Sequence, residues 1–297
     1  MRKFVIISDS CCDLDNNLRK EYDIDYVPMY FNLDGKEYKA DLDWKEISVK
    51  QFYDAMREGK RAYTAQANLQ SYKDAFTKYV EDGYDVLSIS CSSGLSASVK
   101  ASYVARDAVL SEYPEAKIIC IDGLNSCFGL GILCLYASDL RKEGKSIDEV
   151  AQTIEDMKLC VNQECSVDKL TYLKQAGRVS AASAFFGGLL NIKPIIISDA
   201  IGQNFAVEKV KGRKTAINRL VERMKEEYED VPYQKIMIGH SDCIADALEL
   251  KKLVLENVKS DIDINIGYIG PIVGASCGPG TIAVYFIGKK VEVTKGC

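Results

Sequence analysis

The sequence predicts a two-domain α/β protein, because strand and helix signals alternate along most of its 297 residues. In the first half, short apolar runs are separated by helix-length segments, which favours a mainly parallel sheet flanked by helices. In the second half, hairpin signals are mixed with strand–helix units, which favours an α/β domain with a mixed sheet. The charged, glycine-containing stretch 142–146 is the expected boundary, giving domains of residues 1–144 and 145–297.

The first-half elements follow from local patterns of apolar and turn residues. Asp34-Gly35 separates two strand-like runs and is a hairpin signal. Thr64 is expected in a loop between two helices. Strands are expected at 3–8, 26–32, 36–39, 84–90 and 116–121, and helices at 48–57, 71–81, 95–110 and 128–141.

The second-half elements begin with a clear helix start. Ser146 is a plausible N-cap, and Glu149 completes a capping box. A short helix is expected to end at Gly177, and a turn is expected near Gly202. Helices are expected at 146–159, 170–176, 213–228 and 244–258, and strands at 193–198, 205–210, 235–239, 262–269 and 281–287.

Composition is ordinary for a globular protein, with 47% hydrophobic and 27% charged residues. The net charge of −5 argues against non-specific nucleic-acid binding, which needs a basic surface. No apolar run has the length of a membrane span. The first apolar run is too short for the core of a signal peptide, so a cytoplasmic location is expected.

The chain has eleven cysteines and no Cys-x-x-Cys pair. Free cysteine behaves as a small hydrophobic residue when buried, so most of these side chains are expected to be core thiols in a reducing compartment. No set of ligands at zinc spacing is present, and no metal or cofactor is expected.

The single histidine, His240, limits the catalytic chemistry available. Hydrolases with a serine or cysteine nucleophile usually place a histidine base beside it in space, whereas His240 is next to Ser241 in sequence. Asp9 and Asp13 are four residues apart, which does not fit aspartyl-phosphate chemistry. Asp9 is more simply explained as a cap after a strand. No catalytic residue is assigned.

Four polar loops are candidates for ligand binding. Residues 90–98 carry five serines around Gly94 at a strand-to-helix turn, where free N–H groups favour carboxylate or phosphate. The segment 64–66 offers a hydroxyl and an amide. Arg178 follows a helix end and either neutralises helix carbonyls or contacts an anion. The Gly- and Pro-rich segment 269–280 is either a backbone cradle for an anion or a tight connection between two strands.

These loops together resemble the DegV family. Eight motifs occur in the family's order along nearly the whole chain: Ser8-Asp-Ser10, Thr64-x-Gln66, Ser92-Ser-Gly-Leu-Ser96, Gly129-Leu-Gly131, Leu173-Lys through Gly177-Arg178-Val-Ser180, Gly188-Leu-Leu-Asn-Ile-Lys-Pro194, His240-x-Asp242, and Ile269-Gly-Pro through Gly278-Pro-Gly280. The resemblance implies a two-domain α/β protein that buries a fatty acid between its domains. It further implies a FakB-like binding subunit, not itself an enzyme, that presents the acyl carboxylate to a separate kinase subunit for acyl-phosphate formation.

The resemblance also implies the residues of the ligand site. Thr64 and Ser96 match hydroxyls that hold the carboxylate, and Ser276 stands where many relatives have histidine. Serine can donate a hydrogen bond but cannot carry positive charge. Further candidates around the head group are Ser93, Gly94, Arg178 and Gly278.

Alternatives remain open at this stage. The pairs Phe185-Phe186 and Leu189-Leu190 either line the acyl pocket or belong to the core. The ligand is a long-chain fatty acid or another amphiphile, exchanged during transient contact with a membrane. A hydrolase or phosphotransferase that uses a strand-end Ser or Asp is a further alternative, which the lone histidine disfavours.

Overall fold

The structure, a computed structural model, describes residues 2–180 and 191–294. The strands are β1 (Phe4–Asp9), β2 (Ile24–Val27), β3 (Tyr30–Leu33), β4 (Lys36–Lys39), β5 (Ala62–Ala65), β6 (Asp85–Ser90), β7 (Ile118–Asp122), β8 (Val161–Ser166), β9 (Val179–Ser180), β10 (Ile192–Ser198), β11 (Asn204–Lys211), β12 (Ile236–His240), β13 (Ile264–Tyr268) and β14 (Ile282–Ile287). The helices are α1 (Asn16–Tyr22), α2 (Val49–Arg57), α3 (Leu69–Glu81), α4 (Ser98–Glu112), α5 (Cys127–Lys142), α6 (Ile147–Met157), α7 (Leu170–Ala176), α8 (Arg213–Glu227), α9 (Ile244–Asn257) and α10 (Pro271–Cys277), with 3-10 turns η1 (Ser10–Cys12) and η2 (Lys158–Cys160).

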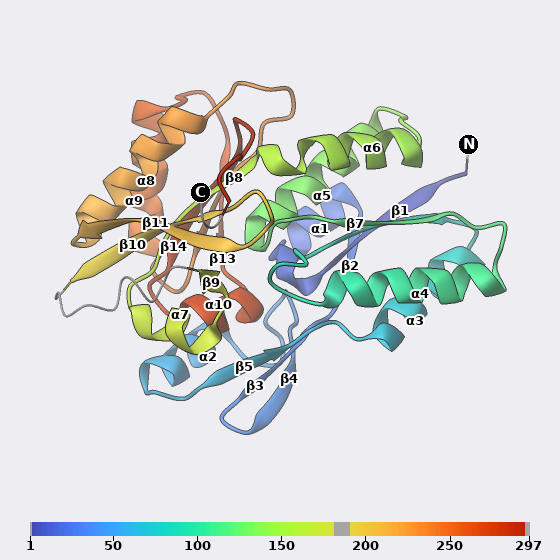
Figure 1. The fold of residues 1–297 in the computed structure, drawn as a ribbon, viewed down its shortest axis with the longest axis horizontal. Coiled ribbons are helices and arrows are strands. Elements are labelled where there is room, and N and C mark those ends of the chain that lie inside the picture. Colours follow the sequence, from blue (N-terminus) through green and yellow to red (C-terminus); the bar gives the residue numbers. More distant parts are fainter. Residues whose placement is uncertain (1, 181–190, 295–297) are drawn as a thin grey trace.

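The first half forms the predicted parallel sheet, with strand order β2-β1-β6-β7. Helices α3 and α4 cover one face, and α1, α5 and α6 lie on the other (Figure 1). Every residue of β1 and β6 is buried, as expected for central strands covered by helices on both faces. The α/β fold class with a parallel first sheet is therefore confirmed.

The second half forms the predicted mixed sheet, with strand order β13-β12-β14-β8-β10-β11-β9. Helix α8 packs on β8, β10 and β14, and α9 packs on β12. Helix α5 contacts strands of both large sheets, so it lies between them. Its sequence explains this position, since most of its residues are apolar and buried around its whole circumference.

A third, antiparallel sheet has the order β4-β3-β5 and includes the predicted hairpin at Asp34-Gly35, where both residues have positive φ. Phe31 of this sheet packs edge-on against Phe52 of α2, with ring centroids 5.3 Å apart. The expected loop at Thr64 is wrong, because Thr64 lies in β5 and pairs with Phe31 of β3. Pairing with a distant strand, invisible in the local sequence, fixes this segment.

The segment 269–280 is more than the strand connection that its composition suggests, because it contains helix α10. Pro271 occupies the first helical position, where its missing N–H costs nothing. Gly274 lets the helix approach α2 closely, since an added Cβ would lie 2.5 Å from the Tyr53 hydroxyl oxygen. The same hydroxyl donates to the carbonyl of Ile269 at 2.6 Å. Helix α10 is thereby fixed on the third sheet and α2.

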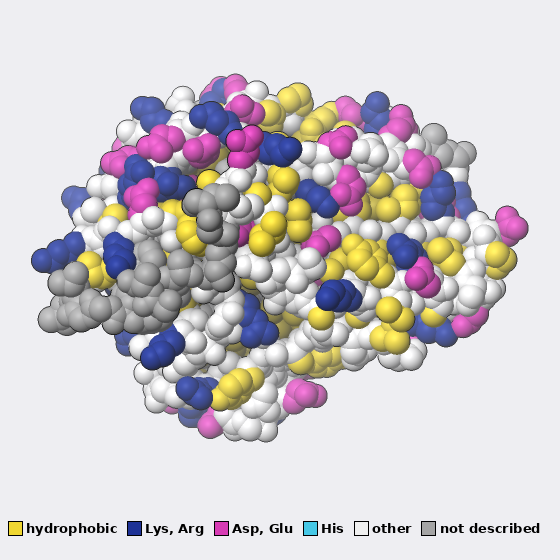
Figure 2. All heavy atoms as spheres, in the orientation of Figure 1, with side chains coloured by type: hydrophobic (Ala, Val, Ile, Leu, Met, Phe, Trp, Pro, Cys, Tyr) yellow, Lys and Arg dark blue, Asp and Glu magenta, His cyan; other side chains and the backbone are white. Residues whose placement is uncertain are grey.

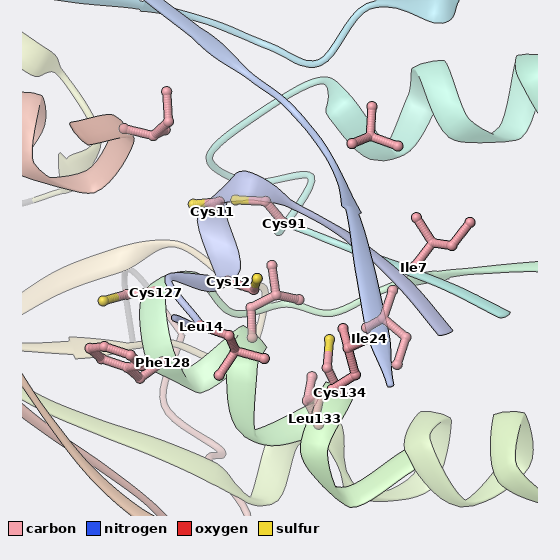
Figure 3. Packing of buried hydrophobic residues seen from close by; sticks show 14 of the residues in the cluster. Ile7, Cys11, Cys12, Leu14, Ile24, Cys91, Cys127, Phe128, Leu133 and Cys134 are labelled. Atoms are coloured by element: carbon pink, nitrogen blue, oxygen red, sulfur yellow. The ribbon is translucent and has the colours of Figure 1, made fainter. Parts of the chain in front are cut away.

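Cysteines contribute substantially to the core around η1 and α5 (Figure 3). The ten cysteines in the described parts of the chain are all free, and seven of them are buried. Burial raises the pKa of the Cys12, Cys127 and Cys165 thiols well above the ordinary value. These side chains act as small hydrophobic residues, as predicted from the sequence.

Candidate functional site

A pocket of about 460 Å³ lies between β5, the turn before α4, and α10. Its volume falls in the range of roughly 300–1,000 Å³ that is usual for small-molecule sites. Residues that line it come from every third of the chain: Cys11, Met29, Thr64, Gln66, Cys91, Ser93, Gly94, Leu95, Ser96, Ala97, Ser126, Arg178, Asn204, Ile272, Val273 and Ser276.

The three hydroxyl residues predicted for the head group, Thr64, Ser96 and Ser276, all line this pocket. They come from β5, the turn before α4, and α10 respectively. Ser93 and Gly94, predicted for the same site, line it as well. The structure therefore brings together groups that lie more than two hundred residues apart in sequence.

The five serines of the 90–98 turn have different roles. Ser92 is buried, and its hydroxyl donates to the carbonyl of Gly202 at 2.7 Å. Ser98 is also buried, and its Oγ accepts from the amide of Ala67 at 3.1 Å. Ser96 shares a 2.9 Å hydrogen bond with Ser98 but also lines the pocket. Two serines thus hold the turn in place, while Ser93 and Ser96 remain available to a ligand.

Asp9 supports the wall of the pocket from beneath. Its carboxylate accepts from the amides of Cys11 at 3.0 Å and Cys91 at 2.8 Å. Complete burial raises the pKa of Asp9 to about 6, although these two hydrogen bonds oppose the increase. Asp9 is thus the cap that the sequence predicts, and it holds Cys11 and Cys91 side by side at the pocket (Figure 3).

Arg178 lies where this pocket adjoins a smaller one of about 130 Å³. Thr64 and Ser276 line both pockets as well. The Arg178 side chain is exposed, and one guanidinium nitrogen donates to the carbonyl of Ala176 at 2.7 Å, near the end of α7. The bond to a helix carbonyl agrees with the first interpretation of Arg178 from the sequence, while contact with an anion stays a prediction.

Charge distinguishes the larger pocket from the surrounding surface. Acidic and basic side chains are interspersed on the face shown in Figure 2. Among the described residues that line the pocket, Arg178 is the one charged side chain, and no carboxylate is present. Hydroxyls, two side-chain amides and a guanidinium beside apolar Met29, Leu95 and Ile272 suit an amphiphilic anion.

Gly278 does not line either pocket but determines how α10 ends. Its φ is 78°, which favours glycine. An added Cβ would also overlap the ring of Tyr172, whose hydroxyl donates to the carbonyl of Met56 at 3.0 Å. Gly278 therefore affects the site indirectly, through the position of Ser276 two residues earlier.

His240 lies outside the described lining of the larger pocket. It is 2% exposed, its Nδ1 accepts from the amide of Cys243 at 3.1 Å, and its ring lies 4.6 Å from that of Tyr268. Burial lowers its pKa. The hydroxyl of Ser241 instead faces the thiol of Cys277 at 3.8 Å. The contacts of His240 with Cys243 and Tyr268 give it a structural role in the core.

Three further expectations from the sequence concern the acyl-pocket side chains, metal binding and membrane spans. The pairs Phe185-Phe186 and Leu189-Leu190 fall outside the described residues. Within residues 2–180 and 191–294, no group of His, Cys, Asp and Glu is arranged to hold a metal ion. In the same ranges no helix combines the length and apolarity needed to cross a bilayer.

Sequence reasoning missed Met29, Ser126 and Asn204 as lining residues. Met29 follows β2, and its backbone amide donates to the hydroxyl of Ser10 at 2.9 Å. Such residues carry no chemical signal of their own and reach the pocket only through the fold.

The fold and the pocket define a three-sheet α/β protein with a ligand site of mixed polarity. A family model described as "Uncharacterised protein, DegV family" matches residues 3–289, and the chain therefore belongs to the DegV family. A DegV domain-containing protein of Clostridium perfringens is 38% identical over 98% of this chain and 100% of its own length.

Solved structures agree with this assignment. A DegV lipid-binding protein from Thermotoga maritima superposes with a TM-score of 0.84, at 26% identity, over 98% of this chain and 100% of the other. A DegV family protein from Thermus thermophilus, described by its fatty-acid binding, has a TM-score of 0.82 at 26% identity and covers 97% of this chain and 100% of its own.

Proposed function

We propose that this protein binds a long-chain fatty acid in the 460 Å³ pocket and presents its carboxylate to a separate kinase subunit. The observation that carries the proposal is the meeting of Thr64, Ser96 and Ser276 in one pocket with apolar side chains, where the described lining holds no carboxylate. Fatty-acid binding by the Thermus relative supports the same ligand class.

The head group is assigned to the hydroxyls of Thr64, Ser96 and Ser276, with Ser93, Gly94 and Arg178 close by. A desolvated carboxylate needs several donors, and charge-assisted hydrogen bonds provide them most effectively. Ser276 supplies a donor without charge, so Arg178 is the described lining residue that can offset the negative charge. The acyl chain is assigned to Met29, Leu95, Ile272 and Val273.

The adjoining 130 Å³ pocket is a suitable route from the carboxylate to the outside. Thr64, Arg178 and Ser276 line both cavities, and the rim includes exposed Lys60 and Arg61. Basic groups at this rim would attract a partner that carries a negatively charged nucleotide. We assign kinase docking to this rim, and the ligand to the space between the domains 1–144 and 145–297.

The test is native mass spectrometry of the protein purified from a bacterial host, together with Ser96→Ala. The expected result is a co-purified C16–C18 fatty acid whose retention falls in the variant, since one donor to a carboxylate contributes roughly 1–3 kcal/mol. Ser111→Ala is the matched control, because Ser111 is exposed on α4 away from the pocket. A different bound amphiphile would redirect the ligand assignment. An empty protein that hydrolyses model esters would refute the carrier function.

A further inference from the structure

Two cysteines, Cys11 and Cys91, line the pocket assigned to the fatty acid but have no part in the proposed function. Cys11 belongs to the turn η1, which follows β1, and Cys91 directly follows β6. Strands β1 and β6 are parallel neighbours in the first sheet, so their carboxyl ends bring both cysteines to the same edge of that sheet. Both residues are free thiols and only 2% exposed.

Asp9 holds the backbones of the two cysteines together. Its Oδ1 accepts from the amide of Cys11 at 3.0 Å, and its Oδ2 accepts from the amide of Cys91 at 2.8 Å. The hydroxyl of Tyr72 also donates to Oδ2, at 3.4 Å. Because one buried carboxylate binds both amides, the two chain segments cannot separate without breaking these hydrogen bonds.

The thiols of Cys11 and Cys91 are also hydrogen-bonded to each other, and the two side chains lie side by side in Figure 3. This hydrogen bond, together with burial, raises the pKa of the Cys11 thiol well above its ordinary value. The same hydrogen bond lowers the pKa of the Cys91 thiol, although burial and nearby carboxylates raise it overall. Cys91 is therefore the thiol of the pair that ionises more readily.

Neighbouring thiols and metal binding explain the pair less well. Cys12, next to Cys11 in sequence, does not line the pocket and lies near Cys134 of α5 instead. Within residues 2–180 and 191–294, no group of three or more His, Cys, Asp and Glu side chains is arranged to hold a metal ion. Two thiols in contact at a pocket wall are instead the arrangement that oxidation can convert to a disulfide.

We infer that Cys11 and Cys91 form a reversible disulfide in the wall of this pocket when a peroxide reaches them. The pocket of about 460 Å³ is far larger than hydrogen peroxide, and the sulfur atoms need only approach to about 2.05 Å. The Cys91 thiolate attacks one peroxide oxygen, the O–O bond breaks, and a sulfenic acid and hydroxide form. The Cys11 thiol then attacks the sulfenic sulfur and displaces its hydroxyl group as water. The proton that Cys91 released neutralises the hydroxide, so a disulfide and water are the products.

Mass spectrometry of delipidated protein treated with excess hydrogen peroxide tests the inference. The expected result is the loss of two hydrogen atoms and a peptide pair linked through Cys11 and Cys91, both reversed by dithiothreitol. Excess peroxide is needed because the raised pKa values keep both thiols largely protonated at neutral pH. A link through Cys12, or oxidation of the pair without a link, would overturn the inference.

Single variants identify the reacting thiols. Cys11→Ser should abolish the link and leave a Cys91 sulfenic acid that dimedone traps. Cys91→Ser should also abolish the link, and it serves as the second probe if Cys11→Ser folds poorly. Cys160→Ser is the matched control, because Cys160 lies in η2 and does not line the pocket, so the link should form as in the unsubstituted protein. A link that persists in Cys11→Ser and Cys91→Ser would contradict the assignment.

Palmitate loading separates the disulfide from the fatty-acid proposal, on which the disulfide itself does not depend. If the acyl chain occupies this pocket, it covers both thiols, and loaded protein should form the link more slowly than delipidated protein. The disulfide would then mark the empty state of the pocket. Equal rates would support the disulfide and contradict the placement of the acyl chain. No link with or without palmitate would overturn the disulfide and leave the acyl site unaffected.

Discussion

Replacing Asp13 by Asn should stabilise the protein at pH 8 and destabilise it at pH 4. Burial in the folded state raises the pKa of Asp13 from an ordinary value of 3.8 to about 7. Between pH 3.8 and about pH 7 the unfolded chain has released the Asp13 proton and the folded chain retains it, so folding stability falls as pH rises. From about 3.8 to about 7 the accumulated loss is about 4 kcal/mol.

The amide of Asn cannot ionise and avoids this loss, but its N–H groups lack acceptors at a cost of roughly 1–3 kcal/mol. The net gain at pH 8 is therefore about 1–3 kcal/mol. At pH 4 the folded carboxyl is neutral and the unfolded carboxyl is only partly ionised, so the amide penalty outweighs the small remaining loss. Urea unfolding across this pH range measures the difference directly. If the variant is less stable than the unsubstituted protein by the same amount at pH 4 and at pH 8, then Asp13 is not a buried carboxylate with a raised pKa.

Two substitutions test packing that the sequence does not reveal. Gly278→Ala should lower the thermal unfolding temperature more than Gly144→Ala does. Both glycines have positive φ, but a Cβ at Gly278 would also overlap the ring of Tyr172, whereas a Cβ at Gly144 would meet no atom. Equal losses of stability in the two variants would contradict the contact with Tyr172. Strain at positive φ alone costs about 1 kcal/mol. Arg223→Met should cost about 3–5 kcal/mol in chemical denaturation, because it leaves Glu164 buried without the guanidinium that now donates to it at 2.6 Å. Adding Glu164→Leu should recover much of this loss, and a double variant as unstable as the single one would argue against the buried pair.

Strand β8 shows why part of the fold escaped prediction. Its central residues, Asn162, Gln163 and Glu164, are polar, yet all are buried in the middle of the mixed sheet. Their partners are distant in sequence: Asn162 donates to the carbonyl of Lys289 at 2.9 Å, and Glu164 accepts from Arg223. A pattern of apolar residues cannot identify a strand whose polar groups are satisfied only by tertiary contacts.

The sequence predicted those residues of the candidate site that belong to a recognisable local pattern. The serine-rich turn and Gly94 carry such a signal, since a helix start offers free N–H groups. Ser276 was found through the family resemblance, but the helix that carries it was not. Gly274 and Pro271 read as loop residues, whereas contact with Tyr53 stabilises a helix there. Asn204 and Met29 had no signal because only the fold brings them to the pocket.

Helix α10 connects the first half of the chain with the pocket assigned to the fatty acid. Gly270, its N-cap, lies against Asp13, while Ile272, Val273 and Ser276 line the pocket. This seven-residue helix therefore carries both the contact with Asp13 and the head-group candidate Ser276. A substitution at Gly270 would for this reason affect ligand retention as well as stability.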